Sequence, residues 1–188
     1  MFPENDKLED NQINNFDMRS HLEGRGLQLE RYPTVSYDEE VCTFPIYTLT
    51  KKLIGYQKYR PQASKTRKND EKYGRYHTHF APGHAGFWGT ESLEYGKSIL
   101  FLTEGIFKAV RLHRFNLPAV ALLGNDPSHL KNHLALTRRK LVAICDFGEA
   151  GTKLAKMGHY SFVCPDGLNL DDMSDRQAFE FLKEMDFR

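Results

Sequence analysis

Acidic side chains follow three apolar segments in the last third of the chain, and their types and spacing suit phosphate chemistry. Glu104 comes after SILFLT, Asp146 comes after KLVAIC, and the acidic segment 166–172 comes after YSFVCP. Carboxylates that meet at one sheet edge can bind a hard divalent cation, which bridges phosphate oxygens and neutralises charge during transfer. The pattern therefore indicates metal-dependent phosphate chemistry. Each acid taken alone has an ordinary alternative, since Asp146 could simply cap the helix that begins near Glu149.

A second feature is a basic stretch between residues 51 and 75, in which only Asp70 and Glu71 are acidic. Its nine cations are Lys51, Lys52, Lys58, Arg60, Lys65, Arg67, Lys68, Lys72 and Arg75. Tyr56 and Tyr59 are interleaved with them, as are two further tyrosines. Aromatic faces beside cations suit single-stranded DNA, because bases stack on the rings while phosphates pair with the charges. The alternative is that the stretch is only a solvated surface loop.

The histidine and cysteine pattern gives little support to a zinc site. The residues concerned are His77, His79, His84, Cys42, Cys145 and Cys164. The cysteines are widely separated and form no CxxC pair, and neither a cysteine nor a near carboxylate completes a tetrahedral set with the histidines. We therefore expect no zinc, buried reduced cysteines, and histidines that are polar or contact phosphate.

The elements that must position the acids alternate in type between residues 98 and 188. Apolar segments near 98–105, 117–124, 140–146 and 160–165 read as strands, and 106–116, 128–139 and 149–158 read as helices. A closing amphipathic helix over 174–185 has Ser174 as its N-cap. Consecutive strands joined by helices predict an α/β fold with a mainly parallel sheet and helices on both faces. The carboxyl ends of such strands share one edge, where functional groups gather.

The preceding residues differ in character. Residues 1–15 are polar and predict a flexible arm, and 16–97 predict a small basic α+β subdomain. In that subdomain a short helix is expected within 16–32 and a hairpin over 41–49 and 53–59. Residues 61–72 predict a loop, and APGHAGFWG predicts a tight turn that delivers aromatic residues to the core.

The totals limit the class of protein. The chain has 188 residues and a formal net charge of +1, which is enough length for one domain or a domain with a smaller subdomain. No apolar run approaches the roughly 20 residues that span a bilayer, and the first residues do not resemble a signal peptide. We expect a cytoplasmic protein without membrane contact.

Three motifs in this order resemble the TOPRIM domain of bacterial and phage-type DNA primases. LTEGIFKAVRLHRFNLPAVALLG is similar to the element in which a strand ends in Glu-Gly, a helix follows, and the next strand ends in Leu-Gly. VAICDFGEAGTKLA is similar to a strand that ends in Asp-x-Asp-x-Ala-Gly, and PDGLNLDDM to the third acidic element. Upstream segments resemble the basic subdomain that precedes TOPRIM, so the likeness covers roughly residues 20–185. No zinc-binding module and no P-loop helicase motif is present in the sequence.

The resemblance implies roles for individual residues. Glu104 matches the motif glutamate, an acid/base or metal-site partner, and Asp146 matches the first aspartate of the pair. The second aspartate falls on Gly148, and the expected aspartate of the third element falls on Asn169. We therefore expect Glu104 and Asp146 to be catalytic and, with Asp171 and Asp172, to hold Mg²⁺ or Mn²⁺. Two lost carboxylates weaken such a site unless neighbouring acids replace them.

These features predict a primase-like replication protein, of a phage or similar mobile element in an infected host cell. It would bind single-stranded DNA along residues 51–75 and join ribonucleotides by metal-dependent nucleotidyl transfer. A replicative helicase or polymerase would be its partner. Two alternatives stay open: a nucleic-acid-binding or replisome scaffold that has lost its metal site, and a TOPRIM nuclease.

Overall fold

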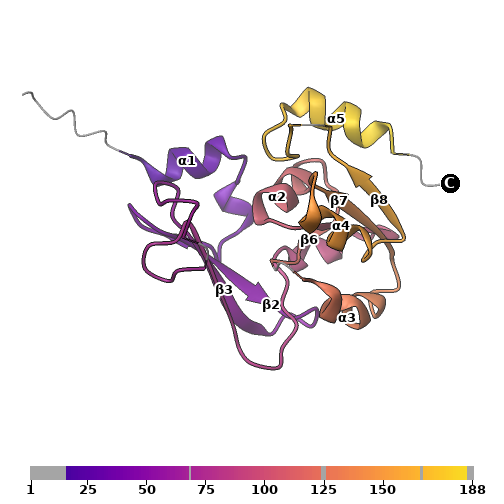
Figure 1. The fold of residues 1–188 in the computed structure, drawn as a ribbon, viewed down its shortest axis with the longest axis horizontal. Helices are drawn as coiled ribbons and strands as arrows, with labels where there is room; N and C mark the ends of the chain where they lie inside the picture. The colour runs from indigo at the N-terminus through magenta and orange to yellow at the C-terminus, as the bar shows by residue number, and fades with distance from the viewer. Residues whose placement is uncertain (1–15, 68, 124–125, 166, 186–188) are drawn as a thin grey trace, which may run out of the picture.

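A computed structural model describes residues 16–67, 69–123, 126–165 and 167–185. These residues form two four-stranded sheets that lie side by side (Figure 1). The first sheet is antiparallel, in the order β1-β2-β3-β4, with β1 (Ser36–Tyr37), β2 (Cys42–Tyr47), β3 (Leu53–Tyr59) and β4 (Tyr76–Phe80). The second is parallel, in the order β6-β5-β7-β8, with β5 (Ile99–Thr103), β6 (Ala119–Ala121), β7 (Lys140–Cys145) and β8 (Tyr160–Val163).

Helices cover both faces of the parallel sheet, because its strands are apolar on both sides. Side chains alternate along a strand, so Phe101 and Val142 face one apolar core while Leu100 and Leu141 face another. Helices α2 (Ile106–Arg114) and α5 (Asp175–Lys183) pack into the first core, and α3 (Lys131–Ala135) and α4 (Glu149–Ala155) into the second. The predicted α/β class with a mainly parallel sheet is confirmed.

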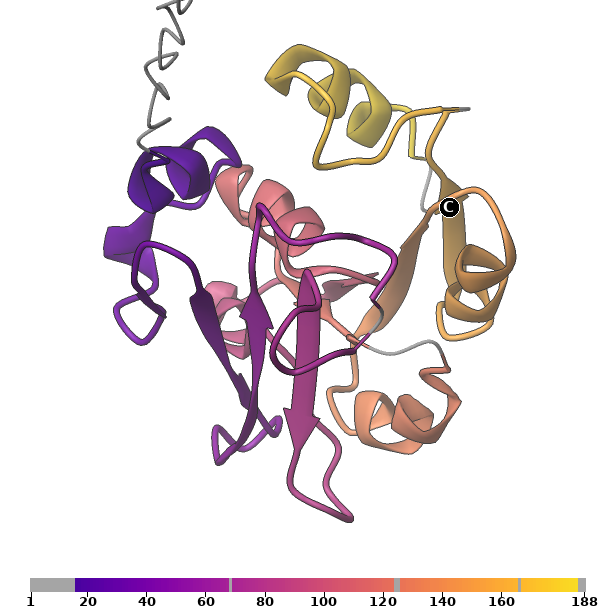
Figure 2. The ribbon, with the colours of Figure 1, turned by 60° about the vertical axis from the view of Figure 1, so that its left-hand side comes forward.

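The antiparallel half is joined to the parallel half by a shared core and a short backbone link. Leu22 from α1 (Met18–Gly24) and Phe44 from β2 pack in the same cluster as Phe107 from α2. The predicted tight turn carries Phe87, which is paired with Tyr47 of β2, and Trp88, which is paired with Ala121 of β6. Figure 2 shows the antiparallel strands standing beside the parallel half. The two sheets therefore hold a fixed relation around one apolar cluster.

Two local features are present as the sequence predicts, and a third, the first helix, is shorter than the segment in which it was expected. The hairpin of β2 and β3 is present as predicted, and Ser174 caps α5 in a reciprocal capping box with Gln177. The helix expected within 16–32 ends at Gly24, because Gly26 adopts a left-handed φ of 84° and a short 3₁₀ turn, η1 (Leu29–Arg31), follows.

Strand β4 was not predicted at all. Its outward residues are polar, so the alternation of YHTHF does not stand out as a half-buried strand. Two further 3₁₀ turns, η2 (Thr90–Tyr95) and η3 (Ser128–Leu130), complete the described elements. The proposed arm, 1–15, lies outside the described residues. Within the described part of the chain, every helix is too short or too polar to cross a bilayer.

Candidate nucleic-acid cleft and carboxylate site

A cleft of about 780 Å³ opens between the antiparallel sheet and the carboxyl ends of the parallel strands. One wall consists of the loop after β3 and the inner face of β3 and β4, and its residues include Lys65, Arg67, Arg75, Gln57, Tyr76 and Thr78. The opposite wall includes Glu104, Lys108, Asp146, Asn169 and Asp171. Cations and an aromatic ring thus face a group of carboxylates across one opening.

Parallel strand geometry brings the predicted acids to this cleft. Glu104 follows β5 and Asp146 follows β7, and these two strands are hydrogen-bonded neighbours. The turn after β5 is held by the Thr103 hydroxyl, which donates to the Gly105 carbonyl at 3.0 Å. Asp171 reaches the cleft from the loop after β8, whereas Asp172 does not line it and instead accepts from the Asn169 amide at 2.7 Å. The structure therefore brings three of the four predicted acids together.

A glycine fixes how closely α4 approaches Asp146. A Cβ on Gly151 would lie 1.9 Å from the Asp146 carbonyl oxygen, a distance that no side chain tolerates. Gly148, at the N-cap of α4, has a φ of 118°, which also favours glycine. An aspartate at position 148 would be strained even though the space around it is open. The carboxylate that the resemblance expects there would therefore strain the backbone of this turn.

Lys108 is buried at the centre of the carboxylate group, and the sequence analysis did not single it out. It lies in the first turn of α2, and the residue is only 7% exposed. Its Nζ donates to Asp146 Oδ2, and it also interacts electrostatically with Glu104. Asp146 is therefore already paired with a cation of the chain itself.

The surroundings of Glu104 raise the pKa of its carboxyl group. Burial raises the pKa of this carboxyl above its ordinary value, and the charge and hydrogen bond of Asp146 raise it further, while the Lys108 ammonium opposes the rise. Glu104 Oε1 and Asp146 Oδ1 are both buried, and neither has a hydrogen-bond partner among the described residues.

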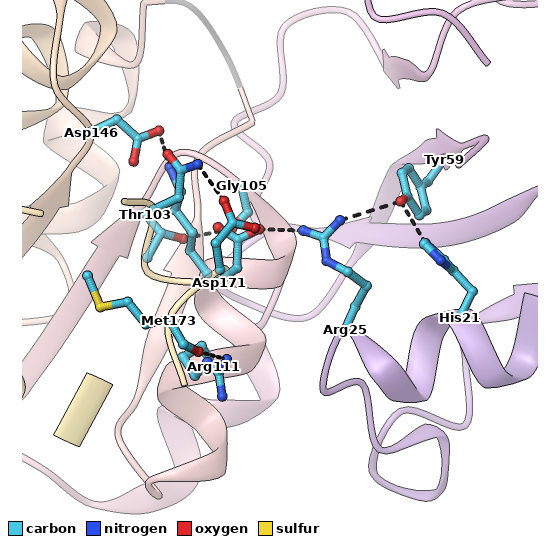
Figure 3. Close-up of polar contacts among 12 residues, drawn as sticks. His21, Arg25, Tyr59, Thr103, Gly105, Arg111, Asp146, Asp171 and Met173 are labelled. Atoms are coloured by element: carbon cyan, nitrogen blue, oxygen red, sulfur yellow. Dashed lines mark hydrogen bonds and ion pairs between the residues drawn. The ribbon is translucent and has the colours of Figure 1, made fainter. Parts of the chain in front are cut away.

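Asp171 belongs to a second charge pair that joins the two halves of the molecule (Figure 3). Arg25, just after α1, donates through Nη2 to Asp171 Oδ2, and its Cζ lies 4.1 Å from the centroid of the Phe107 ring. Arg25 also lies 3.5 Å from the Tyr59 hydroxyl, which in turn lies 2.9 Å from His21 Nε2. Both partners are largely buried, with side chains 27% and 13% exposed for Arg25 and Asp171.

The period of two along β3 and β4 divides the predicted DNA-binding residues between two faces. Gln57 lines the cleft, so Tyr56 and Lys58 point to the opposite face, where Tyr56 stacks on His79 at 5.3 Å and Lys58 pairs with Glu71 at 3.2 Å. Tyr59 is only 2% exposed and packs in the core. Its ring has no free face for a base, which corrects the expectation from the sequence.

The cations of the basic stretch are also divided. Lys65, Arg67 and Arg75 line the cleft. Lys51 pairs with Glu94 at the end of η2, and Lys72 lies 5.1 Å from the ring centroid of Tyr73. The other members that the structure describes outside the cleft are Lys52, Lys58 and Arg60, and Lys68 lies outside the described residues.

The charges at the carboxylate site do not suit a divalent metal ion. In the described ranges, no group of three or more His, Cys, Asp and Glu side chains is arranged to hold a metal. Of the three acids in the cleft, Asp146 is paired with Lys108 and Asp171 with Arg25. A cation of charge +2 would have to bind beside a buried ammonium and displace it from Asp146. His77 and His79 lie on the outer face of β4, where His77 Nδ1 contacts the Asn69 carbonyl at 3.1 Å.

Reasoning from the sequence missed Lys108 and Tyr76, which line the cleft, and Arg25, which pairs with the cleft residue Asp171. Lys108 looked like part of an ordinary amphipathic helix, and Arg25 stood beside glycines in a segment with no motif. Tyr76 was noted only among the interleaved tyrosines, yet it lines the cleft and is 39% exposed. The one available signal was that Lys108 lies in the first turn of the helix that follows Glu104, so the turn from strand to helix brings the two side chains near each other.

Comparison with known proteins identifies the fold. No family model and no curated protein sequence matches the chain. Among solved structures, a DnaG primase catalytic domain bound to single-stranded DNA is similar with a TM-score of 0.62 and 18% identity, over 88% of this chain and 70% of that one. The Escherichia coli primase catalytic core is similar with a TM-score of 0.61 and 19% identity, over 86% and 70%. The primase fragment of the bacteriophage T7 primase-helicase is similar with a TM-score of 0.59 and 14% identity, over 87% of this chain and 71% of that one. The chain thus has the fold of a primase catalytic core.

Proposed function

We propose that this chain is a primase-like protein of DNA replication whose cleft binds single-stranded DNA. The proposal rests on Lys65, Arg67 and Arg75, which line one wall of the cleft together with the partly exposed ring of Tyr76. Cations along a groove attract the phosphates, and an exposed ring gives a base a surface on which to stack. One of the similar primase domains is bound to single-stranded DNA, which supports the same class of ligand here.

Stable binding without catalysis is the activity that the charges favour. Lys108 neutralises Asp146 and Arg25 neutralises Asp171, and the cleft wall opposite carries further positive charge. A protein of this kind would hold template for a separate catalytic chain, and a helicase or polymerase is the class of partner that such a role requires.

Primer synthesis from ribonucleotides is the second candidate, and one observation favours it. Glu104 has a raised pKa and faces Asp146 in the cleft, an arrangement suited to moving a proton near a bound phosphate. This candidate further requires Mg²⁺ or Mn²⁺ to enter the site in the presence of nucleotide.

Binding is tested by fluorescence anisotropy with a labelled single-stranded oligonucleotide. The variant Lys65→Gln/Arg67→Gln removes two cations from the cleft wall. The matched control is Arg176→Gln/Lys183→Gln, which removes one arginine and one lysine from exposed positions on α5. We expect the cleft variant to lose affinity and the control to retain it. Equal affinities for the wild type and the cleft variant would exclude the cleft as the binding site.

Catalysis is tested separately with single-stranded DNA, labelled ribonucleotides and Mg²⁺ or Mn²⁺, with Glu104→Gln as the inactive control. Binding without products in either metal supports the non-catalytic protein. RNA products that the Glu104→Gln variant fails to make support primer synthesis. Metal-dependent loss of the input DNA identifies a nuclease instead.

A further inference from the structure

Lys108 lies where a charged ammonium group would be unfavourable without the acids around it. The residue is 7% exposed, so its ammonium has lost most of its water. It also lies in the first turn of α2, where the partial positive charge of the helix N-terminus repels a cation. The compensating charges come from Asp146, which accepts its hydrogen bond, and from Glu104 beside it. The pair is therefore a built feature of the cleft.

The same ion pairs determine which carboxylate oxygens a metal ion could bind at this site. Asp146 offers Oδ2 to Lys108, so one buried oxygen of each acid in the cleft remains without a partner among the described residues: Asp146 Oδ1, Glu104 Oε1 and Asp171 Oδ1. Asp171, the third acid of the cleft, is directed to Arg25 (Figure 3). Magnesium demands near-ideal octahedral geometry and releases its water reluctantly, so it depends on carboxylates that are free to bind it.

We propose that Lys108 is the resident cation of the carboxylate site and takes the place that a divalent metal ion would otherwise hold between Asp146 and Glu104. The ammonium neutralises Asp146 and keeps both acids in their buried positions. Removal of this one charge should convert the site into one that binds a divalent cation. The proposal concerns the free protein and does not depend on whether the cleft binds DNA.

The experiment measures Mn²⁺ binding to the full chain by the loss of the electron paramagnetic resonance signal of free Mn²⁺. Four proteins are compared: the wild type, Lys108→Met, Lys108→Met/Asp146→Asn, and Lys183→Met as a control for the loss of a lysine. Methionine keeps an unbranched side chain of similar length without the charge. We expect Lys108→Met to bind one Mn²⁺ at least tenfold more tightly than the wild type. The double variant and the Lys183→Met control should bind as weakly as the wild type.

Two outcomes would overturn the proposal. One is a wild-type protein that binds one Mn²⁺ as tightly as Lys108→Met does. The other is a folded Lys108→Met variant, verified by circular dichroism, that gains no affinity. If methionine prevents folding, the wild type and Asp146→Asn still decide the matter by thermal unfolding with and without 10 mM Mg²⁺. The proposal requires that the ion leave the wild-type Tm within about 1 °C, and a larger rise that Asp146→Asn abolishes would contradict it.

Discussion

The salt dependence of DNA binding is the sharpest consequence of a cleft with three cations on one wall. Each phosphate contact to single-stranded DNA contributes about −0.7 to the slope of log affinity against log salt concentration, because counterions are released. Lys65, Arg67 and Arg75 line the cleft, so the expected slope is about −2 for the wild type. Affinity should therefore fall about 20-fold between 50 and 200 mM salt.

The perturbation is the double variant Lys65→Gln/Arg67→Gln. Only Arg75 then remains on this wall, so the slope should become about −0.7 and the same change in salt should weaken binding only about threefold. Arg75 is left in place because its Nε donates to the Ala63 carbonyl at 2.8 Å, so its loss would also disturb the loop.

The assay is a series of anisotropy titrations at four or more salt concentrations, with the exposed α5 variant Arg176→Gln/Lys183→Gln as the control. The control should retain the slope of the wild type, because neither residue lines the cleft. If the cleft variant keeps a slope near −2, other cations contact the phosphates and the assignment of this wall is wrong. If the control changes the slope as much as the cleft variant does, binding is diffuse and the cleft has no special part in it.

Three further results are expected. His113 is fully buried, and burial lowers its pKa to about 4, so below pH 6.5 the unfolded chain binds a proton that the folded chain does not. The free energy of unfolding should therefore fall by up to about 3 kcal/mol as the pH drops from 6.5 towards 4, and urea titrations of a His113→Gln variant should show a shallower fall. Asp171→Asn leaves Arg25 half-buried without its ion partner and should lower stability by roughly 1–3 kcal/mol, whereas Asp172→Asn should change Tm little. Gly151→Ala puts a methyl group against the Asp146 carbonyl and should cost about 1–3 kcal/mol or more, and a Tm equal to that of the wild type would disprove the close approach.

The bonding of His113 explains the direction of its pH effect. Nε2 lies 2.9 Å from the Ala119 carbonyl, which can only accept, so this nitrogen carries the proton. Nδ1 lies 2.8 Å from the Tyr32 hydroxyl, which can then donate to it. A second proton on the ring would place a charged imidazolium in a fully buried site. The neutral ring is therefore the form that fits the folded protein. At lower pH the unfolded chain takes up a proton that the folded chain does not, so the folded state becomes less stable.

The parallel sheet was predictable because its signal is local and its geometry is general. Short apolar segments that alternate with helices specify parallel strands, and parallel strands end at one edge. Glu104 and Asp146 therefore meet in the cleft as expected, since β5 and β7 are neighbours. The basic stretch was harder to interpret because β4 was not recognised. Without its register, Tyr59 could not be assigned to the buried face of the sheet.

The two cations that pair with the acids could not be predicted from the sequence in the same way. Arg25 is separated from Asp171 by 146 residues, and the two meet because α1 and α2 contribute Leu22 and Phe107 to the same apolar cluster. Lys108 lies in the first turn of α2, which begins after Glu104, and the sequence alone gives no sign that this lysine is buried. Its burial comes from the sheet beneath it and the antiparallel half beside it. The motif thus predicts where the carboxylates gather, but the packing of the described residues determines that Asp146 pairs with Lys108 and Asp171 with Arg25.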